Sequence, residues 1–203
     1  MELLHSLQQL FKRFPGIGER QAMRFAYFLA TSDERYIKEL IDTVTSVRKN
    51  VRRCSECFAL SEKIEGGKCP ICNNPKIDRA TLLVVEKDAD RERFIASRSY
   101  SGRYFVLGGL APAIEKEVAS HIRIFELSNL VKNEGTLSEI ILGLSATPDG
   151  ERTEALIISL LSEKIATNGI KISILGKGLS TGTEIEYSDK DTLLNALKSR
   201  TNK

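Results

Sequence analysis

Hydrophobic side chains recur every three or four residues along the first fifty positions of the chain, which is the spacing of amphipathic helices. The pattern predicts one helix over residues 2–14, a second over 19–30 and a third that begins after the capping residues 31–33. A Pro-Gly-Ile-Gly stretch at residues 15–18 ends the first helix. We expect the apolar residues of the third helix to face inward, namely Ile37, Leu40, Ile41, Val44 and Val47. The N-terminal part of the chain is therefore predicted to be a small helical bundle.

After residue 80, short apolar runs alternate with helical patterns. The run at 81–85 is typical of a strand buried on both faces. Further strands are expected at 104–107, 139–144 and 170–175, and helices at 88–97, after Pro112 and at 151–168. Strands that alternate with helices form a parallel sheet through right-handed crossovers. Beyond Gly176, the pattern predicts a short strand near 184–187 and a closing helix near 190–200.

All four cysteines of the chain lie in one short segment, as Cys54-x-x-Cys57 and Cys69-x-x-Cys72 with eleven residues between the pairs. Two such pairs can supply four thiolates to one tetrahedral zinc ion. Two disulfides or four buried free thiols are the alternatives, and a reducing cytosol disfavours disulfides. Because four cysteines close the coordination shell, we expect the zinc to be structural.

The turn at residues 15–18 joins two short helices, an arrangement known as helix–hairpin–helix. Gly16 and Gly18 let the backbone turn tightly and approach another molecule. The N–H groups that open the second helix can cradle a phosphate, and Arg20 and Arg24, one turn apart, can reach neighbouring phosphates. Such contacts hold DNA without reading its sequence. These four residues are therefore predicted to bind DNA, and a plain turn between packed helices is the alternative.

Three carboxylates follow predicted strands. Glu86 ends the first buried strand, and Asp149 and Glu151 come after a later one. In an open parallel sheet, the carboxyl ends of the strands form the ligand crevice. Three carboxylates there suit a magnesium ion, which prefers oxygen ligands. Alternatively, these acids cap turns and the N-termini of helices.

The charge distribution adds a weak indication. The net charge is +3, and residues 1–53 carry ten Lys or Arg against six Asp or Glu. This excess is expected of a region that meets a polyanion, although a solvated helical surface gives the same balance. No apolar run approaches the ~20 residues that span a bilayer, and the start of the chain lacks the pattern of a signal peptide. We therefore expect a cytoplasmic protein with no membrane partner.

Taken in order, these motifs resemble the RecR family of bacterial recombination mediators. The likeness rests on the hairpin from Phe14 to Arg24, on the cysteine spacing, on Val84-Val85-Glu86 and on the stretch 101–109. It continues through the tail from Gly178 to Leu197. The resemblance implies a Toprim fold, a homo-oligomer (a dimer or a tetrameric ring) that surrounds single- and double-stranded DNA, and partnership with RecO and RecF in loading RecA at gaps.

With this resemblance, the chain is expected to be an α+β protein of four modules. They are a helix–hairpin–helix DNA-binding region over 1–53, a four-cysteine zinc finger over 54–77, an α/β Toprim domain with a parallel sheet over 80–175, and a strand–helix tail over 176–203 that contacts other subunits. The implied role is a DNA clamp and not an enzyme.

At the acidic site, the chain departs from the pattern of catalytic Toprim enzymes in one residue. Catalytic Toprim enzymes begin the acidic turn with an aspartate, where this chain has Thr147, so a magnesium site would lack one ligand. We therefore expect Glu86, Asp149 and Glu151 to engage a basic surface of a partner, RecO, through charge pairing. Two alternatives are a small Toprim nuclease that binds magnesium with these carboxylates, and a structural zinc protein with no nucleic-acid role.

Overall fold

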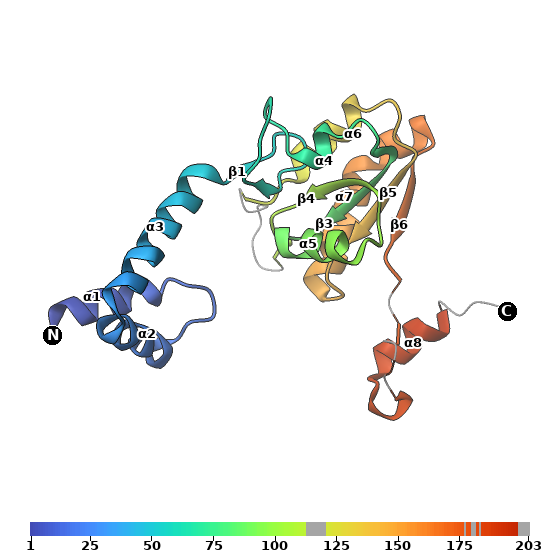
Figure 1. The fold of residues 1–203 in the computed structure, drawn as a ribbon. Coiled ribbons are helices and arrows are strands. Elements are labelled where there is room, and N and C mark those ends of the chain that lie inside the picture. Colours follow the sequence, from blue (N-terminus) through green and yellow to red (C-terminus); the bar gives the residue numbers. More distant parts are fainter. Residues whose placement is uncertain (113–120, 177, 180–181, 183, 199–203) are drawn as a thin grey trace. The chain divides into compact units, whose positions relative to one another are not determined.

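The computed structural model describes residues 1–112, 121–176, 178–179, 182 and 184–198 (Figure 1). It divides the chain into two compact units, Met1–Val51 and Arg52–Lys203, which are described separately. The helix predicted after Pro112 falls on residues 113–120 and lies outside the described residues.

The first unit contains three helices, α1 (Glu2–Phe11), α2 (Glu19–Thr31) and α3 (Glu34–Asn50). Helices α1 and α2 pack together, and Phe11 meets Phe25 edge to face with ring centroids 5.6 Å apart. The first helix ends three residues earlier than predicted. The N–H of Arg13 already bonds to a carbonyl three residues back, that of Leu10, so the chain leaves the α-helical pattern and enters the hairpin turn.

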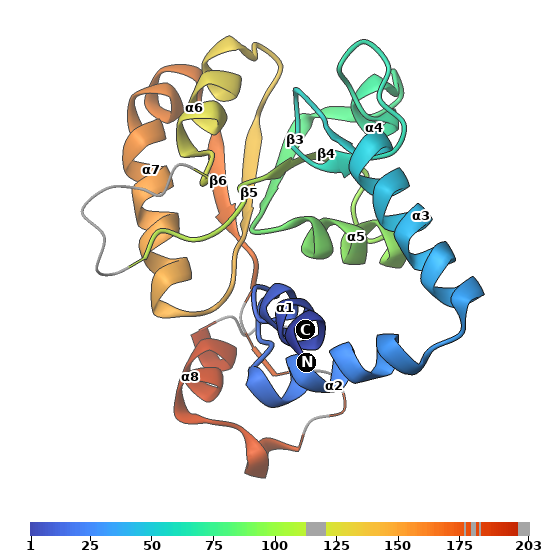
Figure 2. The same cartoon turned by 90° about the vertical axis from the view of Figure 1, so that its left-hand side faces the viewer.

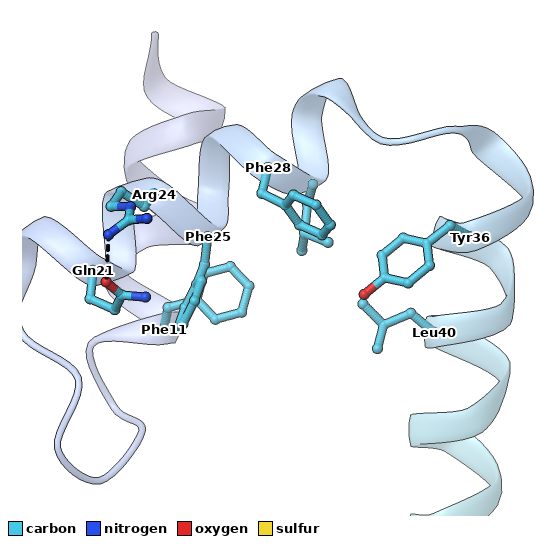
Figure 3. Close-up of a pocket in the computed structure, with 8 residues that line it drawn as sticks. Phe11, Gln21, Arg24, Phe25, Phe28, Tyr36 and Leu40 are labelled. Carbon is cyan, nitrogen blue, oxygen red and sulfur yellow. Dashed lines mark hydrogen bonds between the residues drawn. The ribbon is translucent and has the colours of Figure 1, made fainter.

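Helix α3 begins where predicted, because the Asp33 carboxylate accepts a hydrogen bond of 2.8 Å from the N–H of Tyr36. The prediction that its apolar face points inward is wrong. No residue of α3 is buried, and Ile41, Val44 and Val47 are each more than half exposed. In the first turns of α3, Tyr36 and Leu40 face Phe28 across a groove (Figure 3).

The second unit is built on a four-stranded parallel sheet. Its strands are β3 (Asp78–Val85), β4 (Gly102–Val106), β5 (Glu139–Gly143) and β6 (Lys171–Ile174), in the order β4-β3-β5-β6. Each neighbouring pair is parallel. The connecting helices are α5 (Asp88–Ser97), α6 (Ile124–Asn133) and α7 (Pro148–Asn168). The parallel sheet predicted from alternating strands and helices is thus confirmed.

The two faces of this sheet are covered differently (Figures 1 and 2). Helices α6 and α7 cover one face, where Val84, Phe105 and Leu142 are buried. On the other face, Leu83, Val85 and Val106 pack against α5 and against the four cysteines. The cysteine segment therefore occupies a place where an α/β fold usually has a helix, and its apolar contacts belong to the core of the sheet.

After β6 the tail forms a 3₁₀ turn, Ile185–Tyr187, and helix α8 (Lys190–Lys198). The strand predicted near 184–187 is therefore wrong. The N–H of Tyr187 bonds to the carbonyl of Glu184, and the N–H of Ser188 bonds to that of Ile185, so these groups close local turns. An Ile-Glu-Tyr triplet alternates like a strand, but the pattern does not provide a neighbouring strand to pair with.

Candidate zinc centre and nucleic-acid interface

The four-cysteine segment is held together by short backbone contacts. Strands β1 (Arg52–Arg53) and β2 (Leu60–Ser61) pair antiparallel, so the first cysteine pair sits in the turn between them. The second pair lies at the start of the one-turn helix α4 (Pro70–Asn73). The N–H of Ser55 donates to the carbonyl of Gly67 at 2.8 Å and thereby joins the two halves. Gly67 has a φ of +83°, which favours glycine at this reversal.

The sulfur atoms converge on one point. All four cysteines are buried, and their Sγ atoms lie within 4.8 Å of one another. The Sγ atoms of Cys57 and Cys69 are 3.7 Å apart, and those of a tetrahedral zinc–thiolate shell with ~2.3 Å bonds would be about 3.8 Å apart. A disulfide would need about 2.05 Å. The donor set and its geometry therefore fit a metal ion of the zinc type held by Cys54, Cys57, Cys69 and Cys72.

The pKa values of the cysteines reflect this crowding. Hydrogen bonds from the Cys57, Cys69 and Cys72 thiols lower the pKa of Cys54. The bond to Cys54 is the largest cause that raises the pKa values of Cys57 and Cys72. The ionisation of each thiol therefore depends on its three neighbours, and a divalent cation at their centre would favour all four thiolates.

An ion-pair network attaches the cysteine segment to the sheet. The guanidinium of Arg103, on β4, is almost fully buried and contacts the Glu56 carboxylate at 3.0 Å and the Glu134 carboxylate at 2.5 Å. Glu56 lies between the two cysteines of the first pair and also binds Lys68 at 2.7 Å. One buried arginine therefore connects the first cysteine pair to the end of α6.

The cysteine segment also wraps around the edge of β4. The N–H of Val106 donates to the carbonyl of Cys57 at 2.8 Å. Phe58, which follows Cys57, reaches the other face of the sheet and meets Phe105 with ring centroids 5.4 Å apart. Its φ of +59° belongs to the left-handed region, and it directs the chain around the edge.

The predicted DNA-binding residues lie together on the hairpin of the first unit. Gly16 has a φ of +74°, and a side chain at Gly16 or Gly18 would meet no atom within 4 Å, so both glycines lie on open surface. Gly18 caps α2 in an extended conformation without a side-chain hydrogen bond to the helix start. Arg20 and Arg24 are exposed one turn apart, and the guanidinium of Arg24 lies 3.5 Å from the Gln21 amide oxygen (Figure 3).

The three predicted acidic residues lie around the carboxyl ends of β3 and β5 but have different neighbours. The Glu86 carboxylate accepts a hydrogen bond from the hydroxyl of Ser145, and the Nζ atom of Lys87 lies 3.7 Å from the Oε1 atom of Glu86. Asp149 pairs with Arg152 at 3.7 Å, and Glu151 is exposed on the first turn of α7. In the described part of the chain, the cysteines alone form a convergent group of three or more possible metal ligands. The structure therefore does not place the oxygens of these three carboxylates as ligands of one ion.

Thr147 has a structural role in this turn. Its hydroxyl accepts a hydrogen bond of 3.2 Å from the N–H of Gly150 and caps α7. Gly150 itself is buried, and a side chain there would come within 1.9 Å of the carbonyl oxygen of Ser145. The acidic turn is thus tightly packed against the end of β5, and its conformation requires glycine at this position.

Comparison with known proteins identifies the chain. Residues 80–176 match the model of the Toprim domain. A Recombination protein RecR of Lactobacillus delbrueckii subsp. bulgaricus is 35% identical over 191 residues, which are 94% of this chain and 92% of the relative. The Recombination protein RecR of Dehalococcoides mccartyi is 35% identical over 201 residues, 99% of this chain and 93% of the relative. The chain belongs to the RecR family.

Membership of the RecR family confirms the resemblance inferred from the motifs and assigns the chain to DNA recombination and repair. The described helices of this RecR chain include none that is both long and apolar enough to cross a membrane. The motifs did not reveal Arg103 and Ser145, two residues that hold the predicted sites in place. For Arg103, the available signal was an arginine within an apolar strand pattern. No signal in the sequence pointed to Ser145.

Proposed function

We propose that this RecR chain holds DNA as a homo-oligomeric clamp and acts with RecO and RecF to load RecA at gapped DNA, without catalysing a reaction. The observation that carries the proposal is the match to RecR proteins over at least 94% of the chain. A match of this extent includes the hairpin, the cysteine segment, the Toprim domain and the tail. We assign a separate function to each of these parts.

The hairpin is proposed to bind the phosphates of single- and double-stranded DNA. Gly16 and Gly18 allow the backbone to approach a phosphate, and the N–H groups that open α2 are not occupied by a side-chain cap. Arg20 and Arg24 add two positive charges on the same face. Contacts of this kind bind any sequence, as a clamp requires.

Zinc is proposed to be structural. Cys54, Cys57, Cys69 and Cys72 would complete its coordination shell, leaving no position for a substrate. When bound, the metal would fix the segment that covers one face of the sheet. The exposed apolar side chains of the tail, among them Ile185, Tyr187 and Leu197, support its proposed role in contacts between subunits of a dimer or tetrameric ring.

The acidic residues Glu86, Asp149 and Glu151 are proposed to engage a basic surface of RecO. They surround one end of the sheet without converging, which suits charge pairing over a protein surface better than binding of one small cation. The Toprim match favours a second candidate function, a magnesium-dependent nuclease that uses these same carboxylates. A cleavage assay distinguishes the two functions.

The DNA-binding proposal is tested by replacing Arg20 and Arg24 with alanine and measuring fluorescence anisotropy on single- and double-stranded DNA at several salt concentrations. If each arginine neutralises one phosphate, the log–log salt slope on duplex DNA should become shallower by about 1.8 per bound chain. Replacing Arg35 and Lys38, which are exposed on α3, removes the same charge as a control. An unchanged slope and affinity in the Arg20 and Arg24 variant would show that DNA binds elsewhere.

A further inference from the structure

A second buried arginine, Arg91 on α5, lies beside the cysteine cluster. It is 5% exposed, and its Nη2 atom is 4.0 Å from the Sγ of Cys69. Its guanidinium carbon lies 5.7 Å from the centre of the Tyr104 ring, a cation–π contact that holds the group in place. Arginine is rarely buried to this degree without a partner of opposite charge.

No buried carboxylate of the described residues accounts for the charge of Arg91. Arg103, the other buried arginine of this region, forms ion pairs with Glu56 and Glu134. Among the carboxylates of the described residues, Arg91 pairs with Glu92, whose side chain is 63% exposed, so solvent screens that pair. The Nε of Arg91 is buried and has no hydrogen-bond partner among the described residues. The nearest buried group that can carry negative charge is therefore the sulfur of Cys69.

Four thiolates around one divalent ion carry a net charge of −2, and buried negative charge is costly unless a cation compensates it. We propose that Arg91 is a positioning residue of the zinc centre, whose guanidinium offsets part of this charge and slows the release of zinc. The inference rests on the proposed zinc site. It adds that the metal is retained by a charge from the Toprim domain in addition to the four cysteine ligands.

The proposal is tested on the full chain with three variants. Arg91→Met removes the charge but keeps an apolar stem of similar length, and Arg91→Lys keeps the charge. Arg93→Met removes an exposed arginine two residues away and serves as the matched control. Zinc content is measured first, because a wild-type chain without zinc would refute the zinc proposal itself. Zinc release to a chromogenic chelator is then followed in all proteins that contain one zinc per chain.

Arg91→Met is expected to release zinc about 10-fold faster or more, because groups that support metal ligands typically contribute at least about 10-fold to metal affinity. Arg91→Lys should stay closer to the wild type, and Arg93→Met should match it. A second measurement detects charge directly. In cobalt-substituted protein, loss of a positive charge beside a thiolate should shift the sulfur-to-cobalt charge-transfer band to longer wavelength, which a purely structural role would not cause.

Equal release rates for Arg91→Met and the wild type would overturn the proposal. So would equally fast release from Arg91→Met and Arg91→Lys with an unshifted cobalt band, because packing and not charge would then be responsible. If Arg91→Met does not fold, Arg91→Gln replaces it as the neutral variant, and the same results decide.

Discussion

Replacing Arg103 with methionine tests whether the buried ion-pair network holds the cysteine segment on the sheet. Methionine keeps most of the apolar stem and removes the charge that lies between Glu56 and Glu134. Breaking a buried ion pair by removing one partner costs about 3–5 kcal/mol, chiefly because the remaining charge is left buried and unpaired.

The neighbours of Arg103 place the expected cost at the lower end of this range. Glu56 keeps Lys68 at 2.7 Å and Arg79 at 3.7 Å, so it is not left alone. Glu134 keeps the hydroxyl of Thr136 at 3.3 Å and is 21% exposed, so water compensates it in part. We therefore expect a loss of about 3 kcal/mol, which corresponds to a fall of roughly 6–12 °C in Tm for a unit of this size.

The assay is urea unfolding of the full chain with zinc in excess, followed by circular dichroism. Arg79→Met is the matched control because Arg79 contacts the same Glu56 but is 40% exposed, and a pair of that kind contributes at most about 1 kcal/mol. A double-mutant cycle with Glu134→Gln should give an interaction energy of about 1–3 kcal/mol. The reasoning fails if Arg103→Met costs no more than Arg79→Met, or if the cycle is additive.

Two further predictions concern the metal and the acidic residues. Freshly purified, chelator-free protein should contain one zinc per chain by elemental analysis. The Cys57→Ser variant should lose the metal and unfold more easily, because metal binding and folding are coupled. Wild-type protein without zinc would contradict this prediction. Reversal of Glu86, Asp149 and Glu151 to lysine should impair a pull-down of RecO while DNA binding stays equal or rises slightly, with Glu163→Lys on the same helix α7 as the control. Magnesium-dependent cleavage of DNA or RNA that disappears with Glu86→Ala would instead establish the nuclease.

Local patterns predicted the parts of this fold that depend on local interactions. The spacing of Cys54, Cys57, Cys69 and Cys72 is enough to predict convergence, because each pair lies in one turn and the segment between them is short. The apolar run before Glu86 likewise predicted a strand buried on both faces, and both faces of β3 are covered. Such features need little knowledge of distant residues.

Features that depend on distant partners could not be predicted in this way. The contacts of Arg103 join residues 47 and 31 positions away, and no motif connects those positions. The apolar spacing of α3 correctly predicted a helix, but periodicity does not show what covers an apolar face, and Val44 is exposed in its own unit. The acidic residues likewise share one end of the sheet, yet only side-chain positions show that they do not converge.

The way in which the cysteine segment wraps around β4 has a consequence for aggregation of the protein. Strand β4 is the outer strand of the sheet, and its edge carries Tyr104, Phe105 and Val106, three residues that favour strands. Such an uncovered edge recruits strands from other molecules and starts aggregation. Since the carbonyl of Cys57 accepts a hydrogen bond from the N–H of Val106, the cysteine turn covers this edge at Val106. We therefore expect chains without zinc to aggregate through this edge before the rest of the fold unfolds.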